Sequence, residues 1–195
     1  FCEACRQAFN KMFPEDSALP DIIKADSPAS PGKNPELWTK WLKFREASMT
    51  EFLDNLVNGV GGLRESSPHV PVCVWGYGLA EEDAVKRVLR DSGMDAGNVA
   101  SRVRPDAYCI QTHWPDWMRA DLPADYVKHY KPFFDQVRRV SPKMPLMVQA
   151  DIGSTREAVR DRVWTDEFEK TCRSEGVEST TLYEYFIAGW TYREP

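Results

Sequence analysis

The fold is decided by the stretch Val70-Pro71-Val72-Cys73-Val74-Trp75-Gly76-Tyr77-Gly78, an apolar run that ends in a glycine turn. A short apolar run rich in valine and bounded by glycine is typical of a buried strand. The next segment, 81–92, has helical spacing and an acidic first turn, which stabilises the positive end of a helix dipole. Strand, turn and helix in this order form one βα unit.

Further βα units follow toward the C-terminus. Strands are predicted at 106–112, 145–150 and 180–186, and helices at 123–140 and 155–174. Pro132 should kink the first of these helices, because proline lacks the amide proton that a helix needs. Near-continuous apolar strands between helices indicate parallel strands that are buried on both faces.

The N-terminal third has a different character. A short helix is predicted at 2–13, then an irregular loop at 14–34 that holds four of the fourteen prolines. Pro35 opens a long helix, where proline is tolerated in the first turn, and the pair Gly61-Gly62 ends it.

Four βα periods without a GxGxxG turn favour a (β/α)8 TIM-type barrel over a dinucleotide-binding sheet. The chain begins partway through the βα rhythm, so residues 1–195 are expected to form the C-terminal half of the barrel domain, roughly strands 5–8, with 14–34 as a loop insertion. An upstream half-barrel is then an expected partner, and homo-oligomerisation stays open. The alternative is a complete, small α/β sandwich.

Composition limits the classes of partner. The 195 residues include 25 Lys and Arg against 30 Asp and Glu, a net charge of −5, and the basic residues are dispersed among acidic ones. This pattern argues against nucleic acid and anionic membranes as partners. It leaves the cellular location open.

Polar and aromatic residues stand where the predicted strands end. In a βα barrel the active site lies at the carboxyl ends of the strands. The residues found there are Trp75, Tyr77, Gln111, His113, Trp114, Gln149, Asp151, Glu184 and Tyr185. Aromatic faces stack on sugar rings, amides and imidazole orient hydroxyls, and two carboxylates divide the acid and nucleophile roles, so the set suits a carbohydrate substrate.

Asp151 is the first choice for the nucleophile or base and Glu184 the second, and the other seven residues would position the sugar. Each of these residues also has a simpler, purely structural interpretation. A tryptophan at a strand end often packs as a lid, His113 could cap a turn, and Asp151 could hold the free amides of the next helix.

Five cysteines, at 2, 5, 73, 109 and 172, lack the spacing of a disulfide framework. The last three lie in apolar or helical patterns and are predicted to be buried free thiols. The pair Cys2-x-x-Cys5 has three interpretations: half of a zinc site, a redox pair, or two unrelated thiols.

The opening Phe1-Cys2-Glu3-Ala4-Cys5-Arg6-Gln7-Ala8-Phe9, with the later Trp38-x-x-Trp41-Leu-x-Phe44-Arg45, resembles barrel glycoside hydrolases of the family 42 β-galactosidase type. The resemblance implies that Cys2 and Cys5 match the last two cysteines of a structural zinc site. It also implies an acid/base carboxylate before residue 1 and a nucleophilic Glu at the seventh strand. Residues 146–151 contain no Glu, so Asp151 or Glu184 would serve, or the chemistry has changed.

The leading hypothesis is therefore a glycoside hydrolase that needs no catalytic cofactor and carries a structural zinc at most. A non-catalytic carbohydrate-binding barrel is the second hypothesis. A metal-dependent hydrolase or lyase that uses His113 and Asp151 is the third, although one His and one Asp make a weak metal site.

Overall fold

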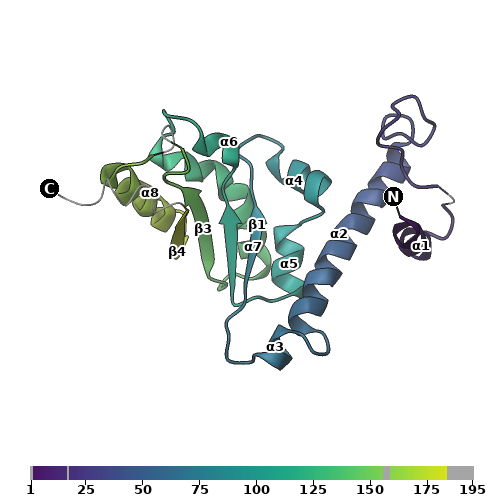
Figure 1. The fold of residues 1–195 in the computed structure, drawn as a ribbon, viewed down its shortest axis with the longest axis horizontal. Coiled ribbons are helices and arrows are strands. Elements are labelled where there is room, and N and C mark those ends of the chain that lie inside the picture. The colour runs from purple at the N-terminus through teal and green to yellow at the C-terminus, as the bar shows by residue number, and fades with distance from the viewer. Residues whose placement is uncertain (1, 17, 156–158, 184–195) are drawn as a thin grey trace.

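The computed structural model describes residues 2–16, 18–155 and 159–183 (Figure 1). The elements in chain order are α1 (Glu3–Met12), α2 (Pro35–Asn58), α3 (Leu63–Ser66), β1 (Cys73–Tyr77), α4 (Ala84–Ser92), α5 (Ala96–Arg102), β2 (Ala107–Gln111), α6 (Trp114–Trp117), the 3-10 helix η1 (Ala124–Tyr130), α7 (Lys131–Val140), β3 (Leu146–Asp151), α8 (Arg162–Ser174) and β4 (Ser179–Tyr183).

The four strands form one parallel sheet in the order β1-β2-β3-β4. Each strand pairs with the next one along the chain, and at least one helix connects every pair. Parallel crossovers are right-handed, so a sheet built in sequential order receives all its crossover helices on the same face.

The main core lies between this face and the helices. Five strand residues point into this core and pack against apolar residues of α4, α5, η1, α7 and α8: Val74, Tyr108, Ile110, Leu146 and Val148. In Figure 1, α7 lies behind the strands. The alternate residues of the strands face the other way, on the side that we call the open face; Cys73 and Trp75 are exposed there, whereas Cys109 and Gln149 are buried.

The prediction of half a (β/α)8 barrel is wrong. The described strands form a single open sheet of four, in which β1 and β4 are the two edges and do not pair with each other. A closed barrel needs a sheet whose first and last strands meet. The βα rhythm predicts parallel pairing of neighbours equally well for an open sheet, so it could not decide closure. The observed class is an open α/β fold.

A second, smaller core joins α1 to the N-terminal half of α2. Phe9 is fully buried against Trp41 and Phe44, with its ring 5.6 Å from that of Phe44 in an edge-to-face arrangement. Lys40 closes this cluster at one side through ion pairs to Glu15 and Asp16. The described residues of 14–34 form turns and bends without a helix or strand, as predicted.

Several element boundaries differ from the prediction. β1 continues through Gly76 to Tyr77, so these residues belong to the strand and the turn follows them. The helix predicted at 155–174 begins only at Arg162, where the Asp161 carboxylate accepts a hydrogen bond from the Trp164 amide.

Pro132 does not kink a helix. It lies in the first turn of α7, where its missing amide proton costs nothing, and the preceding turns are the separate helix η1. Cys73 is exposed because it lies on the open face of an edge strand, whereas Cys109 and Cys172 are buried as predicted. Helix α5 was not predicted.

In the part of the chain that the structure describes, no helix combines the length and the apolarity that crossing a membrane requires.

Candidate functional site

Four polar or aromatic residues are in register across the sheet, next to its carboxyl edge. Strand register places Tyr77 beside Gln111, Gln111 beside Gln149, and Gln149 beside Thr181. Adjacent strands lie about 4.8 Å apart, so the row spans about 14 Å. We call it the glutamine row.

Gln149 stands out within this row. Its side chain is only 5% exposed, and its Oε1 atom has no hydrogen-bond partner among the described residues. A buried amide oxygen that lacks a partner costs about 1–3 kcal/mol. The atom is closed to solvent, so a hydroxyl donor of a bound molecule reaches it only after a neighbouring group moves.

Exposed aromatic residues stand within three positions of the row along the chain. Trp75 precedes Tyr77 on the open face of β1 and is 44% exposed, and Trp114, at the start of α6, is 53% exposed. Tyr183, at the end of β4, is also exposed and stacks against the buried Trp117 with ring centroids 6.4 Å apart. Large flat apolar surfaces are therefore available to a ligand along this edge.

A buried hydrogen-bond network supports the edge from behind. The Thr112 hydroxyl donates to the Gln149 carbonyl oxygen at 2.9 Å, accepts from Trp117 Nε1 at 2.6 Å and contacts the Tyr126 hydroxyl at 2.8 Å. This network ties β2, β3, α6 and η1 together, so it positions the glutamine row on a rigid base.

A second tyrosine holds the segment that follows β2. The Tyr130 hydroxyl donates to Asp116 Oδ2 at 2.7 Å and accepts from the His113 amide at 2.7 Å. Burial raises the pKa of Tyr130 above its usual range, and the nearby Asp116 carboxylate adds to this shift, so the phenol stays protonated and remains a donor. The His113 backbone amide thus anchors the start of α6 to Tyr130.

Asp151 faces its own turn. It is fully buried, Oδ1 accepts from the amides of Gly153 and Ser154 at 2.7 and 2.8 Å, and Oδ2 accepts from the Ser154 hydroxyl. Both oxygens are therefore engaged in holding residues 151–154. Glu184 and Tyr185 lie outside the described residues.

Arg160 is a buried residue of this region that the sequence analysis did not identify. Its guanidinium donates to the carbonyl oxygens of Trp117, Arg119 and Ala120, and it lies 5.4 Å from the Trp164 ring centroid. Burial lowers the pKa of Arg160 from its usual value. Its position in a charge-rich segment gave no signal of burial. Arg160 fixes the loop after α6.

Cys2 and Cys5 meet at the start of α1. Cys2 is the N-cap residue, and the two sulfur atoms lie 3.2 Å apart. The amide of Cys5 lowers the pKa of the Cys2 thiol, and the Cys2 thiol raises that of Cys5. Within the described residues no third Cys, His, Asp or Glu joins them, so these residues alone do not form the four-ligand zinc site that the resemblance implies.

Strand register aligns Tyr77, Gln111 and Gln149 in the glutamine row; Tyr77 also packs against the main core, and Trp75 lies two residues before it on β1. The Asp151 carboxylate is hydrogen-bonded within the 151–154 turn and not to the row. His113 and Trp114 are the N-cap and the first residue of α6, which follows β2. The sequence analysis did not predict Thr181 as a site residue; the register of β4 with β3 places it beside Gln149.

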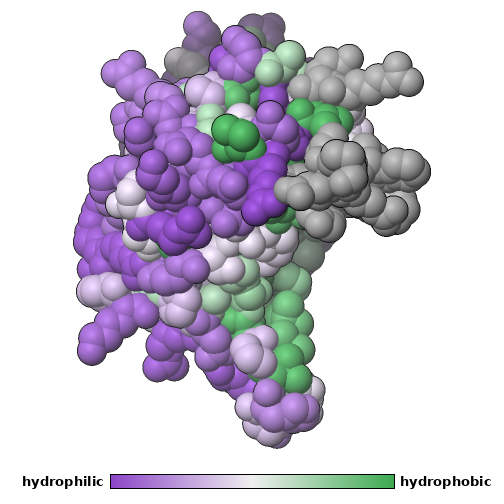
Figure 2. Space-filling view, turned by 90° about the vertical axis from the view of Figure 1, so that its left-hand side faces the viewer, coloured by the Kyte–Doolittle hydropathy of each residue, from purple (hydrophilic) through white to green (hydrophobic). Residues whose placement is uncertain are grey.

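Figure 2, viewed from the α8 side, shows a mainly hydrophilic surface with hydrophobic side chains along one edge.

Comparison of the chain with protein-family models, curated proteins and solved structures finds no significant match.

Proposed function

We propose that the glutamine row and the adjacent aromatic side chains bind a neutral carbohydrate. The observation that carries the proposal is the combination of exposed Trp75 and Trp114 rings with a row of uncharged polar groups, in which the Gln149 Oε1 atom lacks a donor. Sugar hydroxyls both donate and accept hydrogen bonds, and the faces of sugar rings pack on aromatic rings.

The charge distribution supports a neutral ligand. The four residues of the row carry no charge. Two buried charged groups of this region are held by loop contacts: Asp151 within its turn, and Arg160 on three carbonyl oxygens through its NH1 and NH2 groups, while its Nε atom lacks a partner among the described residues. A phosphate or carboxylate ligand would need cationic or amide donors aimed at it. The 14 Å span of the row suits an oligosaccharide of two or three units better than one sugar.

Gln149→Met tests the proposal through two opposite effects. Methionine has a similar shape but no unpaired oxygen, so the free protein should unfold at equal or higher urea concentration, with a gain of up to about 1–2 kcal/mol. Binding of neutral oligosaccharides should weaken at least tenfold. Calorimetric titration with gluco-, galacto-, manno- and xylo-configured trisaccharides measures the affinity, and urea denaturation measures the stability.

Trp75→Ala separates ring stacking from the amide contact. Removal of this exposed ring should weaken binding of the same trisaccharide by about tenfold, which corresponds to about 1.4 kcal/mol, and should leave stability nearly unchanged. Leu56→Ala, an exposed apolar truncation on α2, is the matched control and should bind normally. Absence of binding by the unmodified chain to every neutral sugar, or binding that neither Gln149→Met nor Trp75→Ala weakens, would refute the proposed site.

A further inference from the structure

The dithiol at the start of α1 has the geometry of a pair that can interconvert with a disulfide. Cys2 is exposed and Cys5 is half-buried in the first turn of the helix. A disulfide bond is about 2.05 Å long, so the sulfurs need to approach each other by only about 1 Å from their 3.2 Å separation. Rotation of exposed Cys2 at the helix end can supply this movement.

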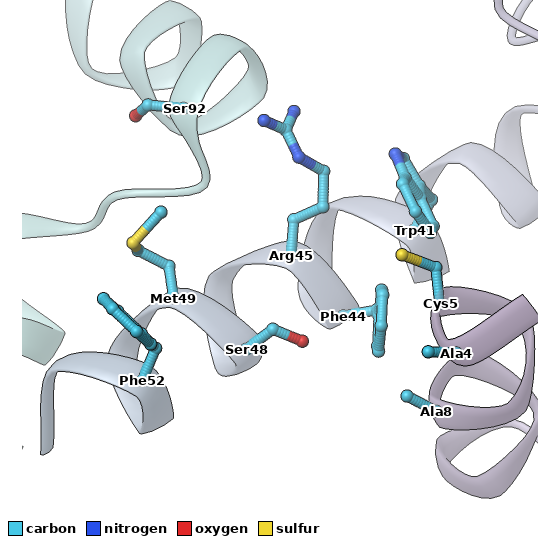
Figure 3. Close-up of a pocket in the computed structure, with 10 residues that line it drawn as sticks. All are labelled: Ala4, Cys5, Ala8, Trp41, Phe44, Arg45, Ser48, Met49, Phe52 and Ser92. Carbon is cyan, nitrogen blue, oxygen red and sulfur yellow. The ribbon is translucent and has the colours of Figure 1, made fainter. Parts of the chain in front are cut away.

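The dithiol borders an apolar groove. The groove has a volume of about 520 Å³ and lies between α1, α2 and the end of α4 (Figure 3). Cys5 lines it together with Trp41, Phe44, Met49 and Phe52. Packing of Phe9 against Trp41 and Phe44 holds α1 on α2, which keeps the two thiols at the groove.

The other cysteines are not suited to the same chemistry. Cys109 and Cys172 are fully buried, and burial raises the pKa of each thiol to about 12. Cys73 is exposed, but its Sγ atom contacts the thioether sulfur of Met147 at 3.9 Å, and a thioether cannot form a disulfide. Among the described cysteines, Cys2 and Cys5 alone form a close thiol pair.

We propose that Cys2 and Cys5 form a thiol–disulfide exchange site whose substrate is an organic disulfide with an apolar or aromatic substituent. Exposed Cys2 is the attacking residue and Cys5 the resolving residue. The groove beside Cys5 receives the apolar substituent. This site shares no residue with the carbohydrate site, so either proposal can fail without the other.

The reaction balances in two steps. The Cys2 thiolate attacks one sulfur of the substrate disulfide RSSR, a bond forms between Cys2 and that sulfur, and the substrate S–S bond breaks to release the first RS⁻. The Cys5 thiolate then attacks Cys2 Sγ and releases the second RS⁻. The protein loses two protons and two electrons as its disulfide forms, and RSSR is reduced to two RSH.

The test uses the neutral aromatic disulfide 4,4′-dithiodipyridine with the reduced chain in a Cys73→Ser background, with a metal chelator present throughout. The expected result is rapid release of two thiopyridone molecules per chain and no retained adduct. Mass spectrometry should show a disulfide between Cys2 and Cys5.

Two substitutions separate the roles. Cys5→Ser should release one thiopyridone and keep the mixed disulfide on Cys2, because the resolving thiol is gone. Cys2→Ser should react at least tenfold more slowly, because the remaining thiol is half-buried. A stable adduct on both cysteines of the Cys73→Ser parent would overturn the proposal, and so would one tightly held zinc ion per Cys2–Cys5 pair when the chelator is omitted.

The groove is tested by comparing the aromatic probe with glutathione disulfide, which is hydrophilic and charged. Phe52→Ala should slow the reaction with the aromatic probe about fivefold and affect glutathione disulfide less. Val60→Ala, which truncates a fully exposed residue outside the groove, is the control and should change neither rate. Equal effects of Phe52→Ala on both probes would remove the groove from the substrate site.

Discussion

Asp151 is the residue whose sequence position and structural surroundings point to different roles. At the end of β3 it stands where a catalytic carboxylate is expected, yet it is fully buried and both oxygens accept hydrogen bonds from residues 153 and 154. A carboxylate that holds two backbone amides stabilises the turn directly after the strand. The geometry therefore favours a role in stability.

Asp151→Ala should lower the free energy of unfolding by about 1–3 kcal/mol, because it leaves buried amides without an acceptor. Asp151→Asn should lose less, since the amide oxygen can still accept from both backbone groups. Urea denaturation gives the values. If instead Asp151→Asn keeps its melting temperature but abolishes hydrolysis of a glycoside that the unmodified chain cleaves, Asp151 is a catalytic residue.

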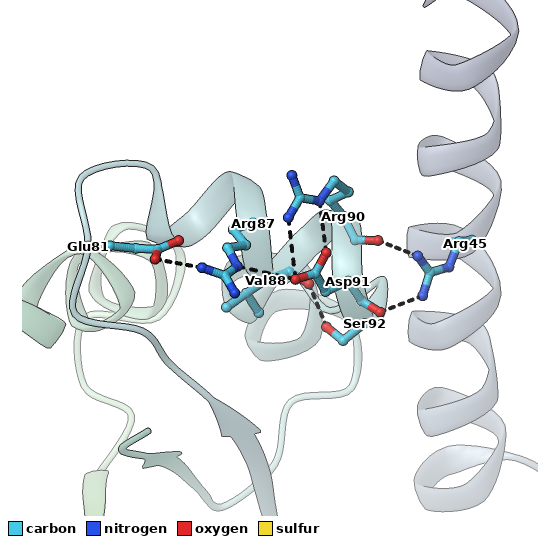
Figure 4. A network of polar contacts seen from close by, with 7 residues as sticks. All are labelled: Arg45, Glu81, Arg87, Val88, Arg90, Asp91 and Ser92. Atoms are coloured by element: carbon cyan, nitrogen blue, oxygen red, sulfur yellow. Dashed lines mark hydrogen bonds and ion pairs between the residues drawn. The ribbon is translucent and has the colours of Figure 1, made fainter. Parts of the chain in front are cut away.

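At the scale of elements, α2 is tied to the sheet region through the end of α4. The Arg45 guanidinium of α2 donates to the carbonyl oxygens of Arg90 and Asp91, the latter at 2.9 Å (Figure 4). These carbonyls are at the negative end of the α4 dipole, where a cation is favourable. Gly93 follows with a positive φ of 76°, and its Cα hydrogens leave room for the Arg45 backbone.

Arg45→Ala should lower the free energy of unfolding by about 1 kcal/mol, a value reduced by the exposure of the contact. Arg45→Lys should recover only part of this loss, because an ammonium group cannot form the same forked contact with two carbonyls. Faster hydrogen exchange of the last amides of α4 should accompany the loss. Lys43→Ala, at an exposed position of the same helix, is the control. Unchanged exchange in Arg45→Ala would show that α4 does not depend on this contact.

At the scale of the whole molecule, the core holds several acidic groups in their neutral form. Burial raises the pKa of the Cys109 and Cys172 thiols from 9.0 to about 12, and it also raises the pKa of Tyr108, Tyr126 and Tyr130 above their ordinary values. In the unfolded chain these groups release protons at lower pH than in the folded protein. Their contribution to stability is thus complete below pH 9.

Stability should therefore fall as pH rises from 9 toward 12, since the unfolded state binds fewer protons than the folded one in this range. Each buried thiol contributes a slope of up to about 1.4 kcal/mol per pH unit. Cys172→Ala should show a shallower decrease between pH 10 and 11 in urea denaturation. Val163→Ala, which removes no titrating group, should keep the slope of the unmodified chain. Equal slopes for Cys172→Ala and the unmodified chain would contradict the assignment.

The sequence alone determined the local elements that depend on short-range spacing. The apolar runs around Val74, Ile110 and Val148 predict strands, and the helical pattern after Pro35 predicts α2, because side-chain periodicity reports which face of an element is buried. Strand-end position also identified Tyr77, Gln111 and Gln149, since parallel strands bring their carboxyl ends to one edge.

Only the tertiary structure decided how these elements close and which side chains meet. Whether β1 pairs with a distant strand depends on contacts far apart in the chain, and no local pattern records them. The same holds for Thr181 in the glutamine row, for the buried Arg160 and for the inward turn of Asp151. Register and burial are properties of the packed molecule, because each is set by partners that the local sequence does not contain.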